Sequence, residues 1–123
     1  MPEESMTFET IRNIQRQEQS DVKLSELPSN FYKRAEEYLK EKKKLFGKSG
    51  ERSISIEIKN VERLLENIFN RRETKIINHA IISARTDIPP QNITEEEKKF
   101  FEIIVAEIKK WRKTGWRSLA KKT

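Results

Sequence analysis

The chain has 123 residues, room for one domain, and 37% of them are charged against about 25% in an average domain. Because only 34% are apolar, the composition argues against a thick α/β core and favours a helical protein whose core is thin or is completed by a partner. The absence of cysteine excludes disulfides, thiolate catalysis and cysteine-ligated metals. The sequence has no apolar run long enough to span a membrane and no signal peptide, so we expect a cytoplasmic protein.

Glycine and proline divide the chain into long uninterrupted stretches, which is typical of helices. The first predicted helix covers residues 7–19, with Ser5 or Thr7 as its expected N-cap. Its apolar residues recur three positions apart and therefore lie on one face: Phe8, Ile11 and Ile14.

The second predicted helix begins after Pro28, with Ser29 as its expected N-cap, and ends in a turn at residues 47–50. Before it, Leu24 and Leu27 are expected to pack against the core. Its Gly-Lys-Ser ending lacks the earlier glycine and the strand of a phosphate-binding loop, which favours a simple turn. Residues at helical spacing along it are Phe31, Tyr32, Ala35, Tyr38, Leu39, Lys42, Leu45 and Phe46.

The third predicted helix covers residues 51–86 and contains no breaker. As one helix it would be about 54 Å long at 1.5 Å per residue, so we expect either an elongated shape or a break. Residues 54–58 also alternate as a strand would, but no other segment offers such a strand a partner, so we favour the helix. A near-heptad stripe runs along it: Ile54, Ile58, Val61, Leu65, Ile68, Arg72, Ile76 and Ala80, widened by Leu64, Phe69, Ile77, Ile81 and Ala84.

Arg72 interrupts the apolar stripe. An arginine at such a position must extend to solvent, pair with an acid or meet a partner. The sequence leaves two interpretations open, an exposed rim and an ion pair between subunits.

The fourth predicted helix follows a loop around Pro89 and Pro90. Thr94 and Glu97 have the spacing of a capping box, in which each side chain binds the other residue's backbone amide. We expect this helix to end at Gly115 in the left-handed conformation, with a contact between Trp111 and Trp116. Its apolar residues are Phe100, Phe101, Ile103, Ile104, Val105, Ile108 and Trp111.

The net charge of +6 is concentrated at the C-terminus. Residues 109–123 contain seven basic residues and no acid, whereas residues 1–108 contain 19 basic and 20 acidic residues. Such a segment indicates contact with nucleic acid or another polyanion, or else it is a solubilising helix end. The candidate residues for this contact are Lys109, Lys110, Arg112, Lys113, Trp116, Arg117, Lys121 and Lys122.

Residues that could carry catalysis are few. His79 is the only histidine, and Lys75 and Ser83 occupy the positions where a metal site would need ligands, so we interpret it as a packing or surface residue. Paired carboxylates such as Glu62 and Glu66 have basic neighbours and favour ion-pair faces over metal-dependent hydrolysis. We therefore predict no catalytic residue, no metal and no cofactor.

Three segments resemble archaeal GINS subunits. Residues 27–32 (LPSNFY) and the helix after them are similar to the entry of the second GINS helix. Residues 61–76 resemble the long GINS helix, which continues through Ala80 to the ending at residues 84–86. Residues 93–101 are similar to the start of the last helix of the GINS A domain, and the order and separation of the segments make the resemblance specific.

The resemblance implies a helical A domain over residues 1–113 and a basic tail or linker stub over residues 114–123. That stub is too short for the β-rich B domain that follows in this class, which needs about 50 residues for its several strands. The matching core or subunit-interface positions are Val61, Leu65, Ile68, Phe69 and Ile76, and the basic positions that serve packing or ion pairs are Arg71, Arg72 and Arg85.

We therefore predict an all-α fold of four to five helices, an elongated GINS A-domain-like bundle with one long central helix. The resemblance implies a non-enzymatic, nucleoid-associated archaeal protein that assembles with other GINS subunits into a hetero- or homo-tetramer. It would scaffold the MCM helicase and a RecJ-like third component at the replication fork. The alternative is a free-standing helical module that binds nucleic acid through its basic tail.

Overall fold

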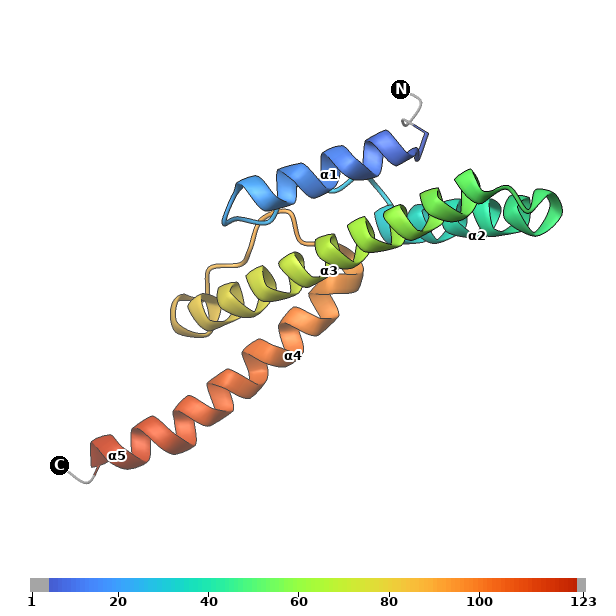
Figure 1. Cartoon of the computed structure of the whole chain (residues 1–123). Helices are drawn as coiled ribbons and strands as arrows, with labels where there is room; N and C mark the ends of the chain where they lie inside the picture. Colours follow the sequence, from blue (N-terminus) through green and yellow to red (C-terminus); the bar gives the residue numbers. More distant parts are fainter. Residues whose placement is uncertain (1–4, 122–123) are drawn as a thin grey trace. The chain divides into compact units, whose positions relative to one another are not determined.

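The computed structural model describes residues 5–121, and every regular element in this range is helical (Figure 1). The predicted all-α fold with a long third helix is therefore confirmed. The chain divides into two compact units, the first ending at Arg71 and the second beginning at Arg72. The elements are α1 (Phe8–Ser20), α2 (Phe31–Ser49), α3 (Arg52–Thr86), α4 (Glu95–Trp111), the π-helix η1 (Arg112–Trp116) and α5 (Arg117–Lys121).

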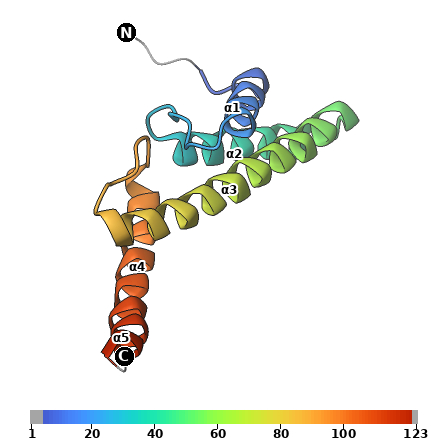
Figure 2. The same cartoon turned by 90° about the vertical axis from the view of Figure 1, so that its left-hand side faces the viewer.

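The first unit contains α1, α2 and the first part of α3. Figures 1 and 2 show α2 and this part of α3 side by side in opposite directions, as their short connection around Gly50 requires. Gly50 has a φ of 65° and donates its backbone N–H to the Phe46 carbonyl at 2.7 Å, which ends α2. The expected turn at residues 47–50 is therefore wrong in its start, because α2 continues through Gly47 to Ser49.

The N-terminal ends of α1 and α2 differ. Thr7 caps α1 by accepting from the Thr10 amide, as predicted. The predicted cap Ser29 is wrong, because Asn30 occupies this position with a φ of 54° and no capping side-chain bond. Asparagine tolerates the left-handed conformation better than most residues, so the chain turns sharply here without a glycine.

The core of the first unit is apolar. Five buried side chains from three helices form it: Ile11, Ile14, Phe31, Val61 and Ile68. Leu27 packs against this cluster, and Leu24 is buried, as predicted. At about 25 cal/mol per Å² of apolar surface, burial of this kind is the main favourable contribution to folding.

Polar bonds at the edge of this core connect the elements. Gln15 donates to Asn67 at 2.8 Å and joins α1 to α3. Buried Glu18 accepts from the amide and hydroxyl of Ser25, which attaches the 21–30 connection to α1. Sequence periodicity alone did not indicate that Glu18 would be buried.

Tyr38 and Glu57 connect α2 to α3. The Tyr38 hydroxyl donates to Glu57 at 2.7 Å, and Lys42 lies 3.2 Å from the other carboxylate oxygen. The bond from Tyr38 lowers the pKa of Glu57 below 4.5, and Lys42 adds to this effect, although burial opposes it. Burial first, and then the bond to Glu57, raise the pKa of Tyr38 above its ordinary value of 10.0.

The stripe predicted along α3 is confirmed as the buried side of that helix. Its members are half-buried or buried from Ile54 to Ala80, and Arg72 is among the fully buried ones. The residues expected to widen the stripe divide into two groups. Leu64 and Ala84 are half-buried, whereas Phe69, Ile77 and Ile81 are exposed.

The second unit contains the last turns of α3 and all of α4, η1 and α5. Contacts with α4 occur in the same order along α3 and the residue that follows it: Arg72 with Glu97, His79 with Phe101, and Asp87 with Lys109. The two helices therefore run in the same direction, and the loop between them runs back along α3 (Figures 1 and 2). Since Lys109 already reaches Asp87 just beyond the end of α3, residues 111–121 extend past it.

Candidate functional site

The predicted interface positions of the first unit differ in what they can contact. Val61 and Ile68 are fully buried within this chain, so they are core residues here. Leu65 is half-buried and packs against the core. Phe69 is 53% exposed and is the apolar residue of this group that a partner could cover. Arg71 donates to Asn67 at 3.1 Å along its own helix.

Arg72 is fully buried and pairs within the chain. Its Nε donates to Oε2 of Glu97 and its Nη2 to Oε1, both at 2.7 Å. The same Nη2 donates to the Asn92 carbonyl at 2.9 Å. The two interpretations that the sequence left open, an exposed rim and an intersubunit pair, are both wrong, because the acid comes from α4 of the same chain.

Glu97 serves two partners at once. The predicted capping box is confirmed: Thr94 Oγ1 accepts from the Glu97 amide, and the Glu97 carboxylate accepts from the Thr94 amide at 3.0 Å. A carboxylate has about four acceptor sites, so the same side chain also accepts the two bonds of Arg72. The local motif was readable in the sequence, but a partner 25 residues away was not.

The other predicted interface positions of the second unit also differ in their burial. Ile76 is buried in its core. Arg85 is exposed in the last turn of α3, where a positive charge suits the helix dipole. Near them, Ser83 is buried and its hydroxyl donates to the Ile88 carbonyl, which anchors the start of the 87–94 loop.

The second unit also exposes large apolar side chains on α3 and α4. Ile77 and Ile81 lie one turn apart on α3, and Phe100 and Ile103 lie three residues apart on α4. Each is more than a third exposed, and Ile103 reaches 64%. Such side chains lower stability and solubility unless another surface covers them.

The basic segment does not have the predicted ending. Gly115 does not adopt the left-handed conformation, and the helix continues through η1 into α5. The Arg117 amide donates to the Arg112 carbonyl, which closes a π-helical turn. The indole of Trp111 lies beside Gly115, with ring carbons 3.5 Å from where a side-chain carbon would be, so the missing side chain leaves room for the ring. The expected left-handed cap at Gly115, which the contact between Trp111 and Trp116 was to accompany, is therefore wrong.

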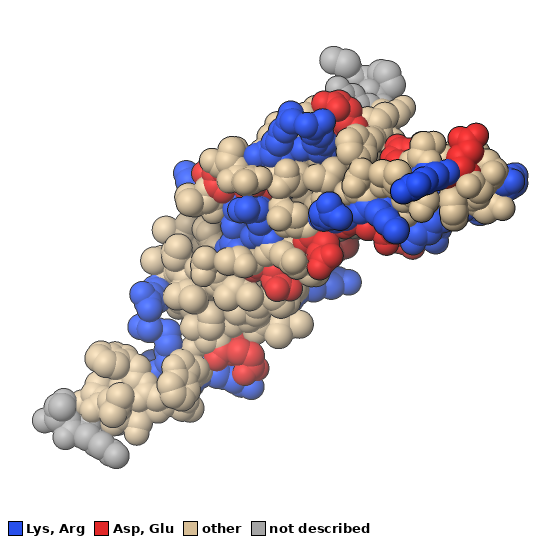
Figure 3. Space-filling model, viewed as in Figure 1, with Lys and Arg blue, Asp and Glu red and all other residues tan. Residues whose placement is uncertain are grey.

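The charges of this segment fall into two groups. Lys109 pairs with Asp87 at 2.8 Å and Lys110 lies 3.8 Å from Glu107. No ion pair is found for Arg112, Lys113 or Arg117 within residues 5–120. Of the remaining predicted residues, Lys121 lies in α5 without a described side chain, and Lys122 lies outside the described residues. Residues other than Lys, Arg, Asp and Glu dominate the visible surface of η1 and α5 (Figure 3), in keeping with the exposure of Trp111, Trp116 and Leu119.

Residues 5–114 match the Sld5 family, described as the GINS complex protein helical bundle domain. The chain belongs to the GINS family. The match covers most of the chain and includes all of α1 to α4. No curated protein and no solved structure matches this chain. As a GINS complex subunit, it has a role in DNA replication.

GINS subunits are non-catalytic scaffolds, and this chain is therefore not an enzyme. The carboxylate of Glu62, one of the pair considered above, lies 4.0 Å from Lys43, and that of Glu36 lies 3.1 Å from Lys40. Within the described residues, the structure contains no cluster of three or more potential metal ligands.

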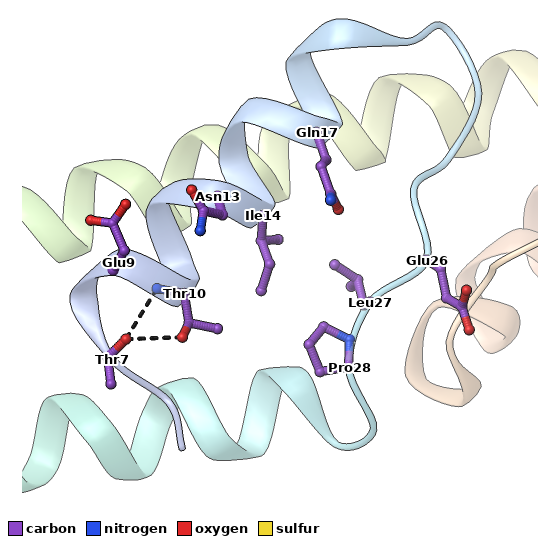
Figure 4. Close-up of a pocket in the computed structure, with 9 residues that line it drawn as sticks. All are labelled: Thr7, Glu9, Thr10, Asn13, Ile14, Gln17, Glu26, Leu27 and Pro28. Carbon is purple, nitrogen blue, oxygen red and sulfur yellow. Dashed lines mark hydrogen bonds between the residues drawn. The ribbon is translucent and has the colours of Figure 1, made fainter. Parts of the chain in front are cut away.

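The first unit of this GINS subunit has an open groove of about 620 Å³ between α1 and residues 26–28 (Figure 4). Ile14 and Leu27 form an apolar patch in it, and the carboxylates of Glu9 and Glu26 lie at opposite ends. The two acids therefore flank the apolar patch and do not converge on one point of the groove.

His79 packs against another aromatic ring and carries no partner on one nitrogen. Its ring centroid is 6.3 Å from that of Phe101, and its Nε2 is buried without a hydrogen bond in the described part of the chain. This placement agrees with the predicted packing role. No helix within residues 5–121 is both long enough and apolar enough to cross a membrane.

Proposed function

We propose that this GINS subunit assembles with other GINS subunits into a tetramer that scaffolds the MCM helicase and a RecJ-like third component at an archaeal replication fork. The observation that carries the proposal is the set of exposed apolar side chains on α3 and α4, within a chain that matches the GINS helical bundle. The low apolar fraction of 34% has the same explanation, because part of the hydrophobic contact would be made between subunits.

Assembly is tested by co-expressing the chain with candidate GINS subunits and weighing the purified complex by native mass spectrometry. The variant Ile81→Asp with Ile103→Asp should lose the complex and remain folded by circular dichroism, because both side chains are exposed in the single chain. The control Asn78→Asp with Ala106→Asp adds the same charge at exposed positions on the same helices and should assemble normally. A monodisperse monomer across a wide concentration range, with no partner recovered, would refute the proposal.

Binding of the helicase is a separate step of the same experiment. The assembled complex is mixed with MCM helicase and with a RecJ-like protein, and co-elution is measured by size-exclusion chromatography. Assembly without co-elution would retain the GINS role and reject these two partners.

A second candidate function is DNA binding through the basic segment. It is favoured by the two exposed indoles and by Arg112, Lys113 and Arg117, for which no ion pair is found within residues 5–120. Deleting residues 109–123 should then abolish binding and remove its salt dependence. Unchanged binding by the shortened chain would reject this function and leave the scaffold role intact.

A further inference from the structure

The two tryptophans of the chain both lie in the basic segment. Trp111 is 72% exposed and Trp116 is 63% exposed, although tryptophan normally buries most of its surface. We propose that these indoles form a stacking platform for the bases of single-stranded DNA. This inference deepens the second candidate function and rests on it, and it is independent of assembly with other subunits.

The π-helical turn determines which way the two indoles face. In a regular α-helix, residues five apart lie about 140° from each other at 3.6 residues per turn. In a π-helix the hydrogen bonds join residues five apart, so Trp116 lies about one turn above Trp111 on the same side. Single π-turns within α-helices occur frequently at functional sites.

Cations flank the platform. Lys113 and Arg117 are exposed and Arg112 is half-buried, and no carboxylate occurs between residues 109 and 120. Lys109 and Lys110 already face Asp87 and Glu107, so we assign phosphate binding to Arg112, Lys113 and Arg117, for which no ion pair is found within residues 5–120. A positively charged surface combined with exposed aromatic rings is the pattern that single-strand-binding proteins use.

The indoles favour single-stranded over double-stranded DNA. An unpaired base presents a free ring face, and each base stacked on an aromatic side chain strengthens binding. In a duplex the base faces are covered by their neighbours, and only their edges are accessible in the grooves. An acidic peptide would satisfy the charges of this segment but would not need two flat rings.

Intrinsic fluorescence reports on this site alone, because the full chain has no other tryptophan. We titrate the protein with oligo(dT), with a duplex of equal length and with poly-glutamate, and measure tryptophan quenching and anisotropy. Oligo(dT) should quench the fluorescence and bind more tightly than the duplex, and its affinity should fall with salt. Equal affinity for the duplex without quenching, or tighter binding of poly-glutamate, would overturn the proposal.

Two variants test the geometry of the platform. Trp116→Ala should weaken oligo(dT) binding by roughly 5- to 150-fold, the range expected for losing one stacked base. The exchange Trp116→Arg with Arg117→Trp keeps the composition and charge but moves the indole to another side of the helix, and it should weaken binding to a similar extent. Wild-type affinity in the exchanged variant would show that charge alone binds the DNA and would refute the platform.

Phe46 provides a matched control. It is an exposed aromatic residue at the end of α2 with lysines on both sides in the sequence. Phe46→Ala should leave oligo(dT) affinity unchanged, because this residue lies outside the platform. Circular dichroism of each variant verifies that the helices remain. Normal DNA binding by the chain without residues 109–123 would refute the second candidate function. Normal binding by the two Trp116 variants, together with loss of binding in the shortened chain, would refute the stacking platform alone.

Discussion

Both units of the chain bury a carboxylate, Glu18 in the first and Glu97 in the second, but their cores otherwise differ. The first unit has a cluster of aliphatic and aromatic residues contributed by three helices, and two of its ion pairs, Lys40 with Glu36 and Lys43 with Glu62, are exposed. The second unit buries Ile76, Ala80 and Phe101, and beside them a charged pair, Arg72 with Glu97. Apolar packing has no preferred direction, whereas the charged pair aligns α4 and its preceding loop in one register along α3.

The two cores should therefore tolerate different substitutions. A hydrophobic cluster loses stability in proportion to the volume removed, and it adapts to similar shapes. Removing either member of a buried charged pair strongly destabilises the protein, because the remaining charge stays buried without an opposite charge in a region that excludes water. Substitutions in the two units should therefore differ in their effect on the free energy of unfolding.

Arg72→Met should destabilise the protein by about 3–5 kcal/mol, because it leaves the Glu97 carboxylate buried without its cation. Equilibrium unfolding in urea, followed by circular dichroism, measures the change. Combining Arg72→Met with Glu97→Gln should recover much of the loss, since glutamine still caps α4 through the Thr94 amide. A loss of stability below about 1 kcal/mol in the single variant would show that the pair contributes no more than an exposed ion pair does.

Ile68→Ala should cost about 2–5 kcal/mol, as expected for a fully buried isoleucine in the first unit. Its neighbour Phe69 is the matched control, because it is 53% exposed and Phe69→Ala should change stability by no more than about 0.5 kcal/mol. The same urea titration compares both variants. Equal losses would contradict the division between core and surface on this helix.

Thr94→Ala should cost about 1 kcal/mol, the usual effect of removing an N-cap. Thr7→Ala removes a cap of the same chemistry from α1 and is the natural comparison. We expect the larger loss at Thr94, because its cap also holds the carboxylate that binds Arg72. If thermal denaturation shows Thr7→Ala to be the more damaging, capping and the charged pair are not coupled.

Tyr38→Phe should lower stability near neutral pH by about 0.5–1.5 kcal/mol, the contribution of one hydrogen bond. The pKa of Glu57 is lowered in the folded protein, so the stability that Glu57 contributes is present above pH 4.5 and is lost as the pH falls further. The pKa of Tyr38 is raised, so its contribution is lost as the pH rises above 10.0. The gap between wild type and variant should therefore narrow at both extremes of pH.

Urea titrations across the pH range measure this gap. Glu36→Gln is the control for these titrations. It breaks an exposed ion pair with Lys40 on one helix and should change stability by less than about 0.5 kcal/mol. A constant difference between Tyr38→Phe and wild type from acid to alkaline pH would contradict the coupling of Tyr38 and Glu57.

Much of the secondary structure was predictable because it depends on neighbouring residues. The spacing of apolar residues located the four long helices, and the capping signals at Thr7 and Thr94 placed two helix starts correctly. The errors occurred where several local solutions compete. Asn30 took the left-handed position that begins α2, and Gly115 continued the helix although glycine commonly ends one.

The candidate interface was less predictable than the helices. The resemblance to GINS subunits placed Val61 and Phe69 in one group of core or interface residues, and the structure separates them into a buried and an exposed position. Periodicity identifies the side of a helix that is apolar, but not how far the neighbouring helices extend over it. The basic segment was visible from its composition, whereas the π-turn that orients its two indoles was not.

The helices and the apolar stripe of α3 were predictable from the sequence, because each depends on residues within a few turns of one another. The uneven distribution of charge follows directly from the order of the residues. The burial of Arg72, in contrast, depends on the tertiary structure. The 87–94 loop runs back along α3 and brings Glu97 to it, so that two charges, 25 residues apart, neutralise each other away from water. No local pattern encodes such a pairing, because it depends on how a loop folds and where the next helix begins.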